Sequence, residues 1–257
     1  MTLYPESSYA QSFVKYGIWD EAASTIRGNR ILVKDGVSTA IGIFYYGYNI
    51  GQTTVIDGND IRCEKIVPGQ KPIGIHKKGI SWALSSPSEI TNNLIAGFYS
   101  QIDICPDDSL YVFTNNTLVA PKGQNSGSSC ASIYAFYTYW ENNIFYSENT
   151  LGYALLMPYT NTYWGHQLNN NLFYVPDGAK AYSQNLATSM LPQNNNLEAD
   201  PEFIDLTPGQ EDYRLKPTSP CIDAGSASQA TTHGPKLIPV PLMVTDLDGN
   251  ARPHGAA

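Results

Sequence analysis

Residues 140–145 read Trp-Glu-Asn-Asn-Ile-Phe, and variants of this six-residue pattern recur along the chain. The pattern is an apolar residue, any residue, Gly or Asn, Asn, any residue, and a second apolar residue. A repeat of this kind, at intervals of a few tens of residues, indicates a solenoid in which each repeat forms one coil. The full copies begin at Ile26, Ile56, Ile90, Phe113, Trp140 and Leu168, at steps of 30, 34, 23, 27 and 28 residues, and a degraded copy covers Asn194–Leu197.

The chemistry of the pattern favours β-strands over helices. Gly or Asn at the third position suggests a backbone at positive φ, which can turn the chain sharply between two strands. The next Asn can then bond along the stack to its equivalents in adjacent coils. The flanking apolar residues are expected to point inward and the residues between them outward. Stacking should then place Arg27 beside Asp57, and Arg30 beside Asp60, as exposed neighbours that contribute little stability.

A second repeated signal lies 11 to 18 residues before the motif Asn of several coils. It marks the start of another short strand in each coil: Gly17-Ile18, Gly42-Ile43, Gly74-Ile75 and, in the fourth coil, Asp103-Ile104. We therefore predict an all-β fold, a right-handed parallel β-helix of about six to seven coils with an irregular C-terminal segment. In this single domain, residues 1–16 form a cap or trimmed edge, 17–198 the coils, and 199–257 an extension that packs on them.

Composition limits the function. The 257 residues are 42% hydrophobic and only 15% charged, with 18 Tyr, so the chain can build a core. A net charge of −8 argues against nucleic acid as the main partner. No run of about 18 apolar residues exists, so no membrane span is expected. The N-terminal residues do not read as a signal peptide, yet the Asn- and Tyr-rich, Lys-poor surface favours secretion, with a signal already removed, over a cytosolic location.

The four cysteines are Cys63, Cys105, Cys130 and Cys221, and their spacing matches no zinc motif. They are interpreted as small buried apolar residues. The alternative is one disulfide, for which Cys105 and Cys130, about one coil apart, are the best candidates.

The C-terminal quarter loses the repeat and carries motifs of its own. The series resembles the tail of right-handed parallel β-helix repeat proteins of the pectate-lyase-like superfamily, especially those with a choice-of-anchor Q type ending, and the Asn repeats resemble their body. This resemblance implies secretion and often a polysaccharide partner, but not catalysis. The tail motifs are Asp200-Pro201-Glu202-Phe203-Ile204-Asp205, Asp212-Tyr213-Arg214-Leu215, Ser219-Pro220-Cys221-Ile222-Asp223-Ala224-Gly225 and Asp246-Leu247-Asp248-Gly249-Asn250-Ala251-Arg252-Pro253.

A basic cluster between residues 62 and 78 is the best catalytic candidate. A lyase that acts on uronic acid sugars needs a cation to neutralise the carboxylate and a base to remove the adjacent proton. His76 is the candidate base, with Arg62 and Lys77 or Lys78 as cationic clamps. It belongs to a rank, meaning a row of equivalent positions on successive coils, that Trp19 and Phe44 also occupy. The alternative is that the cluster is a solvated loop between coils.

Aromatic residues crowd the fifth and sixth coils. If Tyr137, Tyr139, Tyr163 and Trp164 point outward, they form a flat platform for sugar rings. If they point inward, they fill the core. The sequence thus predicts a carbohydrate-active extracellular protein, with two alternatives: a polysaccharide lyase, or a non-catalytic glycan-binding or adhesion module.

Two acidic stretches are weaker candidates. Residues 246–250 resemble the start of a calcium loop, but an EF-hand would need Glu where Ala257 stands, so we interpret them as a terminal turn. Calcium elsewhere on an acidic wall remains an open alternative, and no metal ligands are assigned. Asp107-Asp108 could pair as in a glycoside hydrolase, but is interpreted as a turn.

Overall fold

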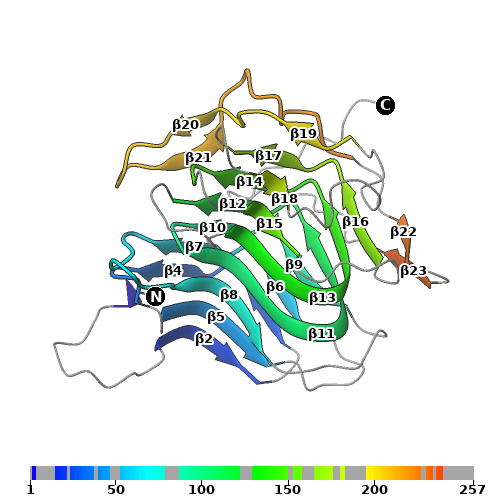
Figure 1. Cartoon of the computed structure of the whole chain (residues 1–257), viewed down its shortest axis with the longest axis horizontal. Coiled ribbons are helices and arrows are strands. Elements are labelled where there is room, and N and C mark those ends of the chain that lie inside the picture. Colours follow the sequence, from blue (N-terminus) through cyan, green and yellow to red (C-terminus); the bar gives the residue numbers. More distant parts are fainter. Residues whose placement is uncertain are drawn as a thin grey trace.

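The computed structural model describes the parts of the chain that form the solenoid and its C-terminal hairpins (Figure 1). These parts contain strands, turns and bends, and the strands stack as parallel coils. The all-β parallel solenoid predicted from the repeat is confirmed. The described residues are 2–3, 15–21, 24–37, 40–46, 53–78, 87–121, 129–149, 153–157, 165–175, 180–182, 195–226, 230–233 and 236–239.

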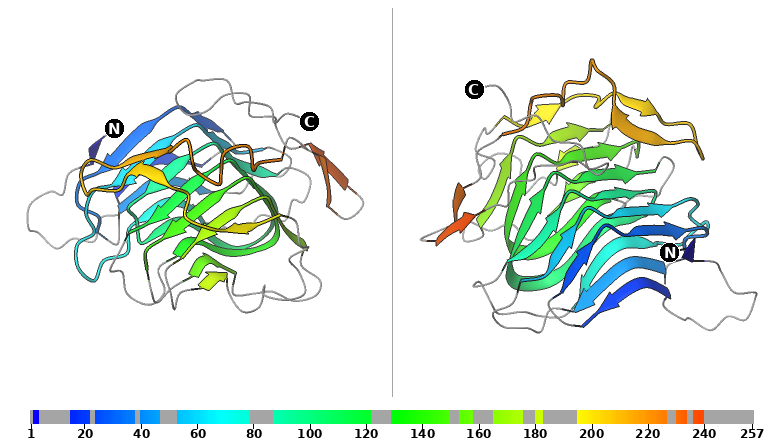
Figure 2. Two further views of the ribbon diagram at one scale, coloured as in Figure 1. Left: turned by 90° about the horizontal axis from the view of Figure 1, so that it is seen from above. Right: turned by 180° about the vertical axis from the view of Figure 1, so that it is seen from behind.

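One wall of the solenoid is an eight-stranded parallel sheet that takes one strand from each successive coil (Figure 2). Between β4 and β17 the chain makes about five turns, slightly fewer than predicted. The outermost strands, β1 and β19, have only two residues each. In stacking order the strands are β1 (Thr2–Leu3), β4 (Arg30–Val33), β7 (Asp60–Cys63), β10 (Leu94–Ala96), β12 (Thr117–Ala120), β14 (Ile144–Ser147), β17 (Leu172–Tyr174) and β19 (Leu197–Glu198).

The other walls belong to an eleven-stranded sheet that bends around a corner. Two long strands, β11 (Ser100–Thr114) and β13 (Ser129–Glu141), run through the bend, as Figure 1 shows. The shorter strands lie on one arm or the other. The first arm holds β2 (Lys15–Asp20), β5 (Ala40–Tyr46), β8 (Ile73–Lys78), β15 (Tyr153–Leu156) and β18 (Lys180–Tyr182); the second arm holds β3 (Thr25–Arg27), β6 (Val55–Asp57), β9 (Ser88–Thr91) and β16 (Gly165–Asn169).

The six-residue motif forms the corner between the second arm and the eight-stranded sheet. Its third position has positive φ, between 52° and 66°, in all seven copies, as predicted. The following Asn side chains form one continuous ladder. From the second rung onward, each Oδ1 accepts hydrogen bonds of 2.9–3.0 Å from the backbone N–H and Nδ2 of the preceding rung. The rungs are Asn29, Asn59, Asn93, Asn116, Asn143, Asn171 and Asn196.

The apolar residues of the motif fill the core, as predicted from the pattern. Phe113 and Trp140 stack with ring centroids 3.7 Å apart, and Phe145 stacks on Phe173 at 4.7 Å. The repeated glycines of the first arm face this core. A Cβ on Gly42 would lie 2.6 Å from the Ile61 side chain of the opposite wall. The Gly-Ile signal therefore marks positions where the opposite wall leaves no room for a side chain.

The fourth coil departs from the predicted register. Ile102, rather than Ile104, pairs with Ile75, so Gln101 takes the place that Gly74 occupies in the coil before. Asp103 consequently lies beside His76. Asp107 and Asp108 do not form the predicted turn: they lie within β11, where the register with β13 shifts.

The structure also settles the predicted cysteine and charge contacts. All four cysteines are free, so the alternative of a Cys105–Cys130 disulfide is wrong; Cys63 and Cys130 are buried, as interpreted from the sequence, whereas Cys105 and Cys221 are only partly buried. Cys130 lies opposite the position of Gln101, four residues before Cys105, and at about 3.3 Å per residue that offset is too long for a disulfide. The predicted ion pairs are confirmed, Arg27–Asp57 at 2.7 Å and Arg30–Asp60 at 3.9 Å, but Asp57 is 7% exposed and so is not the exposed partner that was predicted.

The C-terminal extension crosses the outer face of the eight-stranded sheet. An antiparallel hairpin of β20 (Phe203–Asp205) and β21 (Asp212–Leu215) packs Phe203, Tyr213 and Leu215 onto that face. Farther along, Ser226 exchanges two hydrogen bonds with the side chain of Asn142, at 2.9 and 3.0 Å. A second hairpin follows, formed by β22 (Ala230–His233) and β23 (Lys236–Pro239).

Candidate functional site

The outer face of the first arm carries a group of aromatic rings from its first two coils. Tyr16 and Trp19 lie on β2, and Phe44 and Tyr46 on β5; together they are called the aromatic shelf. The Trp19 ring centroid is 4.4 Å from that of Tyr16 and 4.7 Å from that of Phe44. Trp19 is 48% exposed, although its indole N–H donates to Glu21 at 2.9 Å. Phe44 is only 4% exposed, and Tyr16 and Tyr46 are partly exposed, so the shelf presents mainly the Trp19 ring to solvent.

The third coil extends the aromatic shelf with a charged pair. The His76 ring centroid lies 5.7 Å from that of Phe44, in the rank predicted from the sequence. Its Nδ1 lies 3.2 Å from a carboxylate oxygen of Asp103 and 3.2 Å from the Asp103 carbonyl oxygen. Burial on its own lowers the pKa of His76, but hydrogen bonds with Asp103 and Cys105 raise it to about 9. The imidazole is therefore a cation at neutral pH.

The two lysines after His76 point in opposite directions, because side chains alternate along a strand. Lys77 is 1% exposed and its Nζ lies 5.8 Å from the ring centroid of Tyr111, so it faces the interior. Lys78 is exposed, on the same side as His76. Of the two lysines proposed as clamps, only Lys78 can meet a ligand on the outer face.

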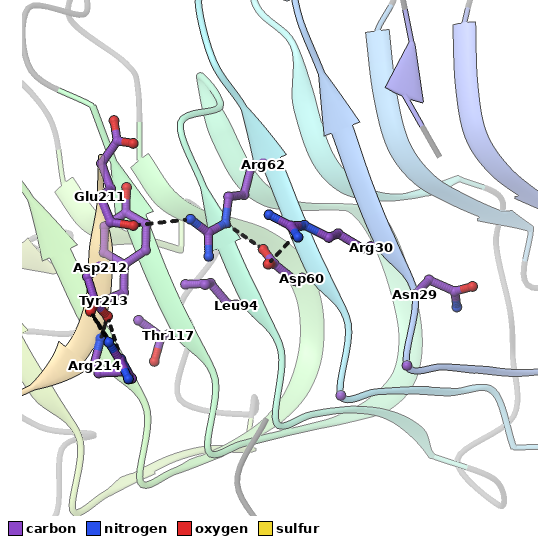
Figure 3. A pocket seen from close by; sticks show the side chains of 12 residues that line it. Asn29, Arg30, Asp60, Arg62, Leu94, Thr117, Glu211, Asp212, Tyr213 and Arg214 are labelled. Carbon is purple, nitrogen blue, oxygen red and sulfur yellow. Dashed lines mark hydrogen bonds and ion pairs between the residues drawn. The ribbon is translucent and has the colours of Figure 1, made fainter. Parts of the chain in front are cut away.

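Arg62 lies on β7 in the eight-stranded sheet, whereas His76 lies on β8 in the eleven-stranded sheet. Arg62 donates from Nε to Asp60 at 2.6 Å, and its guanidinium lies 5.4 Å from the ring centroid of Tyr213. Arg62, Asp60 and Tyr213 line a pocket of about 430 Å³ (Figure 3). His76 is not among the residues that line this pocket. The structure thus assigns the predicted base and one predicted clamp to different surfaces.

The aromatic residues predicted as a platform are placed only in part. Tyr139 is 2% exposed, and its hydroxyl donates to Glu141 at 2.8 Å. Tyr137 is half-buried and packs with Tyr139 in a small apolar cluster. Tyr163 and Trp164 lie outside the described residues, as does the candidate calcium loop at 246–250. Tyr139, at least, offers no open ring to a ligand.

The second arm holds two carboxyl groups with unusual surroundings. Burial raises the pKa of Glu89, with a smaller contribution from the charge of Asp57. Burial also raises the pKa of Glu141, although hydrogen bonds from Tyr139 and Ser226 oppose that change. Within the described parts of the chain, no group of three or more His, Cys, Asp or Glu side chains could hold a metal ion.

Sequence reasoning found His76 and its rank but missed three neighbours. Tyr46 could have been found by extending the alternation two residues beyond Phe44, whereas Tyr16 lies three residues before Trp19 and alternation alone would place it on the opposite face. Asp103 was out of reach because the register of the fourth coil differs from the predicted one.

Comparisons with protein-family models, curated proteins and solved structures gave no match to this chain. The class of the protein therefore rests on its architecture, a parallel β-solenoid with an Asn ladder at one corner. Among the described residues, no helix has the length and apolar character needed to cross a membrane.

Proposed function

We propose that this protein binds an acidic polysaccharide, one that contains uronic acid units, on the aromatic shelf and the adjoining His76. The observation that carries the proposal is the continuous rank of Trp19, Phe44 and His76. The exposed Trp19 ring stands at one end of this rank and the cationic His76 at the other. Aromatic rings offer flat apolar faces for sugar rings, and cations pair with carboxylates. Both groups lie on the outer side of the first arm.

The dimensions of the solenoid suit a chain-like ligand. Coils stack about 4.8 Å apart, so neighbouring positions in a rank form a regular row. A polysaccharide laid across the coils would meet the exposed Trp19 ring and, two coils on, the 14% exposed His76, with the buried Phe44 supporting both. Lys78 would lie two residues beyond His76 on the same face. A rigid row of this kind needs little reorganisation on binding.

Binding is favoured over lyase chemistry by the state of His76. A general base must be unprotonated at the working pH, but contacts with Asp103 and Cys105 raise the pKa of His76 to about 9. Arg62 lies on another sheet and does not extend the cationic site around His76. A lyase remains the second candidate because the His76–Asp103 pair resembles the oriented imidazole of general acid–base catalysis.

The repeat and tail motifs support the same substrate class. Their resemblance to right-handed parallel β-helix proteins of the pectate-lyase-like superfamily, with a choice-of-anchor Q type ending, implies a secreted protein with a polysaccharide partner. We extend the proposal to that location and to right-handed coils, the usual hand of parallel strand crossovers.

The test is calorimetric titration with an oligomer of galacturonic acid and, separately, with its neutral galactose counterpart. Binding of the acidic oligomer alone is expected, and His76→Gln should weaken it about tenfold because a charge-assisted contact is lost. Arg27→Gln is the matched control, since it removes an exposed cation from the second arm. Failure to bind either oligomer would overturn the proposal, and ultraviolet-absorbing unsaturated products would establish the lyase alternative.

A further inference from the structure

The outer face of the eight-stranded sheet changes from charged to apolar between its second and third coils. Along one rank, Arg62 is followed by Ala96, Val119 and Tyr146. The hairpin of β20 and β21 covers the apolar part through Phe203, Tyr213 and Leu215. The pocket of about 430 Å³ forms where this cover ends, between the charged coils and residues 211–214 of the hairpin.

Arg62 is held in a fixed orientation inside this pocket. Its Nε donates to Asp60 at 2.6 Å, one Nη donates to the Glu211 carbonyl at 3.4 Å, and its guanidinium lies over the Tyr213 ring. Those hydrogen bonds use two of the five N–H donors that a guanidinium carries. Three N–H donors remain, and the side chain is 29% exposed where it lines the pocket. A guanidinium can bind a carboxylate through two N–H groups in a bidentate arrangement.

The surroundings of Arg62 suit a small polar ligand. Arg30 converges on Asp60 from the neighbouring strand, as Figure 3 shows, and adds a second positive charge. Across the pocket, a hydrogen bond from Arg214 lowers the pKa of Asp212 to about 2, so that carboxylate is already engaged. Leu94 and Thr117 supply an apolar patch and a hydroxyl to the lining.

We propose that this pocket binds a single sugar acid unit, with the ligand carboxylate on the remaining N–H donors of Arg62 and its hydroxyls near Asp60 and Thr117. The volume is within the range of pockets for small molecules, which suits one sugar unit. The choice of a sugar acid over another carboxylate rests on the proposed function. The anion site itself rests only on the geometry of Arg62.

The experiment is a calorimetric titration of the whole chain with galacturonate, galactose and acetate. Galacturonate is expected to bind, and galactose is not. Arg62→Gln should weaken galacturonate binding about tenfold or more through loss of the bidentate contact. Arg30→Gln, at a side chain that is 80% exposed, should weaken it less and leaves the fold intact even if Arg62→Gln does not. Arg27→Gln is the control and should leave binding unchanged.

The outcomes separate this pocket from the aromatic shelf. Trp19→Ala should leave galacturonate binding unchanged while weakening the oligomer. If Trp19→Ala also abolishes galacturonate binding, or Arg62→Gln has no effect on it, the pocket proposal fails while the shelf proposal stands. Equal binding of acetate and galacturonate would show a general anion site and overturn the sugar acid assignment. If the wild-type protein binds galacturonate but does not bind the oligomer, the proposed function is contradicted and the pocket proposal stands.

Discussion

Two outer faces of the solenoid carry aromatic rings in contact with one another, and among the described residues a hairpin covers one of them. On the eight-stranded sheet, Tyr146 stacks on Tyr174 at 4.8 Å, and Phe203 of the hairpin packs edge-on against Tyr146 at 5.4 Å. On the first arm, Trp19 and Phe44 lie 4.7 Å apart, but Trp19 stays 48% exposed. Parallel stacking generates aromatic rows on either face, and the later chain decides which row becomes core and which becomes surface.

The two faces should therefore differ in what their aromatic residues do. Burial of a large ring contributes about 1.5–3 kcal/mol to folding. Rings beneath the hairpin provide that stabilisation, whereas the exposed Trp19 ring of the aromatic shelf provides less of it and remains available to a ligand. The predictions below test this division, beginning with a change that should damage both faces.

Asn143→Ala should have the largest effect, because both faces depend on the same ladder. Its Nδ2 donates to the Phe113 carbonyl at 2.9 Å and to Asn171 at 2.9 Å, and its Oδ1 accepts from Asn116. Leaving these buried groups unsatisfied should cost about 4 kcal/mol. Urea unfolding measures the loss. Asn29→Ala, at the first described rung, is the control and should cost about 1 kcal/mol; equal losses would contradict the cooperative ladder.

Phe203→Ala should be the next most harmful change, because it uncovers the apolar part of the eight-stranded sheet. Phe203 is 3% exposed and contacts both Tyr146 and Tyr213. We expect a loss of about 3 kcal/mol in the free energy of unfolding. The neighbouring Ile204→Ala is the matched control, since that side chain is 45% exposed and should change stability little.

Trp19→Ala, on the aromatic shelf, should have the opposite effect to Phe203→Ala: little change in stability and a large loss of binding. The free energy of unfolding is expected to change by less than about 1 kcal/mol, because the ring is largely exposed. Affinity for the galacturonic acid oligomer should fall about tenfold or more, as for an aromatic anchor in a binding site. Unfolding and titration of the same preparation measure both quantities. A large stability loss with unchanged affinity would make the shelf a structural surface.

Binding should also depend on pH through His76, by a smaller amount. The folded pKa of about 9 lies above the ordinary value of 6.5, so folding favours the protonated form. Its contribution to stability and binding is fully present below about pH 6.5 and is lost as pH rises through about 9. Asp103→Asn should lower the pKa of His76, because burial then opposes the charge. A proton NMR titration of the imidazole measures this; an unchanged pKa would contradict the pairing.

The sequence predicted the solenoid because its signals are local. Positive φ at Gly28 or Asn142 and a ladder Asn in the next position are requirements of one corner, repeated in each coil. The inward flanks and the Arg27–Asp57 pair then followed from alternation and stacking.

The candidate site was harder to predict because it depends on register and on distant segments. Gln101 takes the place of a glycine in the coil before, although the two residues have no likeness in sequence. Its amide is buried there and donates to the Phe98 carbonyl at 2.7 Å. The register shift that places Asp103 beside His76 could therefore not be predicted from the sequence. The contact between Arg62 and Glu211 joins residues 149 positions apart, and nothing in either stretch indicates that the hairpin crosses this face.

The open shelf is the central claim, and its most direct test is a comparison of indole N–H resonances by NMR as the galacturonic acid oligomer is added. Trp19 lies on the aromatic shelf, whereas Trp140 is fully buried and donates to Thr138 at 3.0 Å. We predict that the Trp19 resonance shifts to saturation while the Trp140 resonance stays in place. A Trp19 resonance that does not move when the protein is saturated with ligand would contradict the assignment of this face.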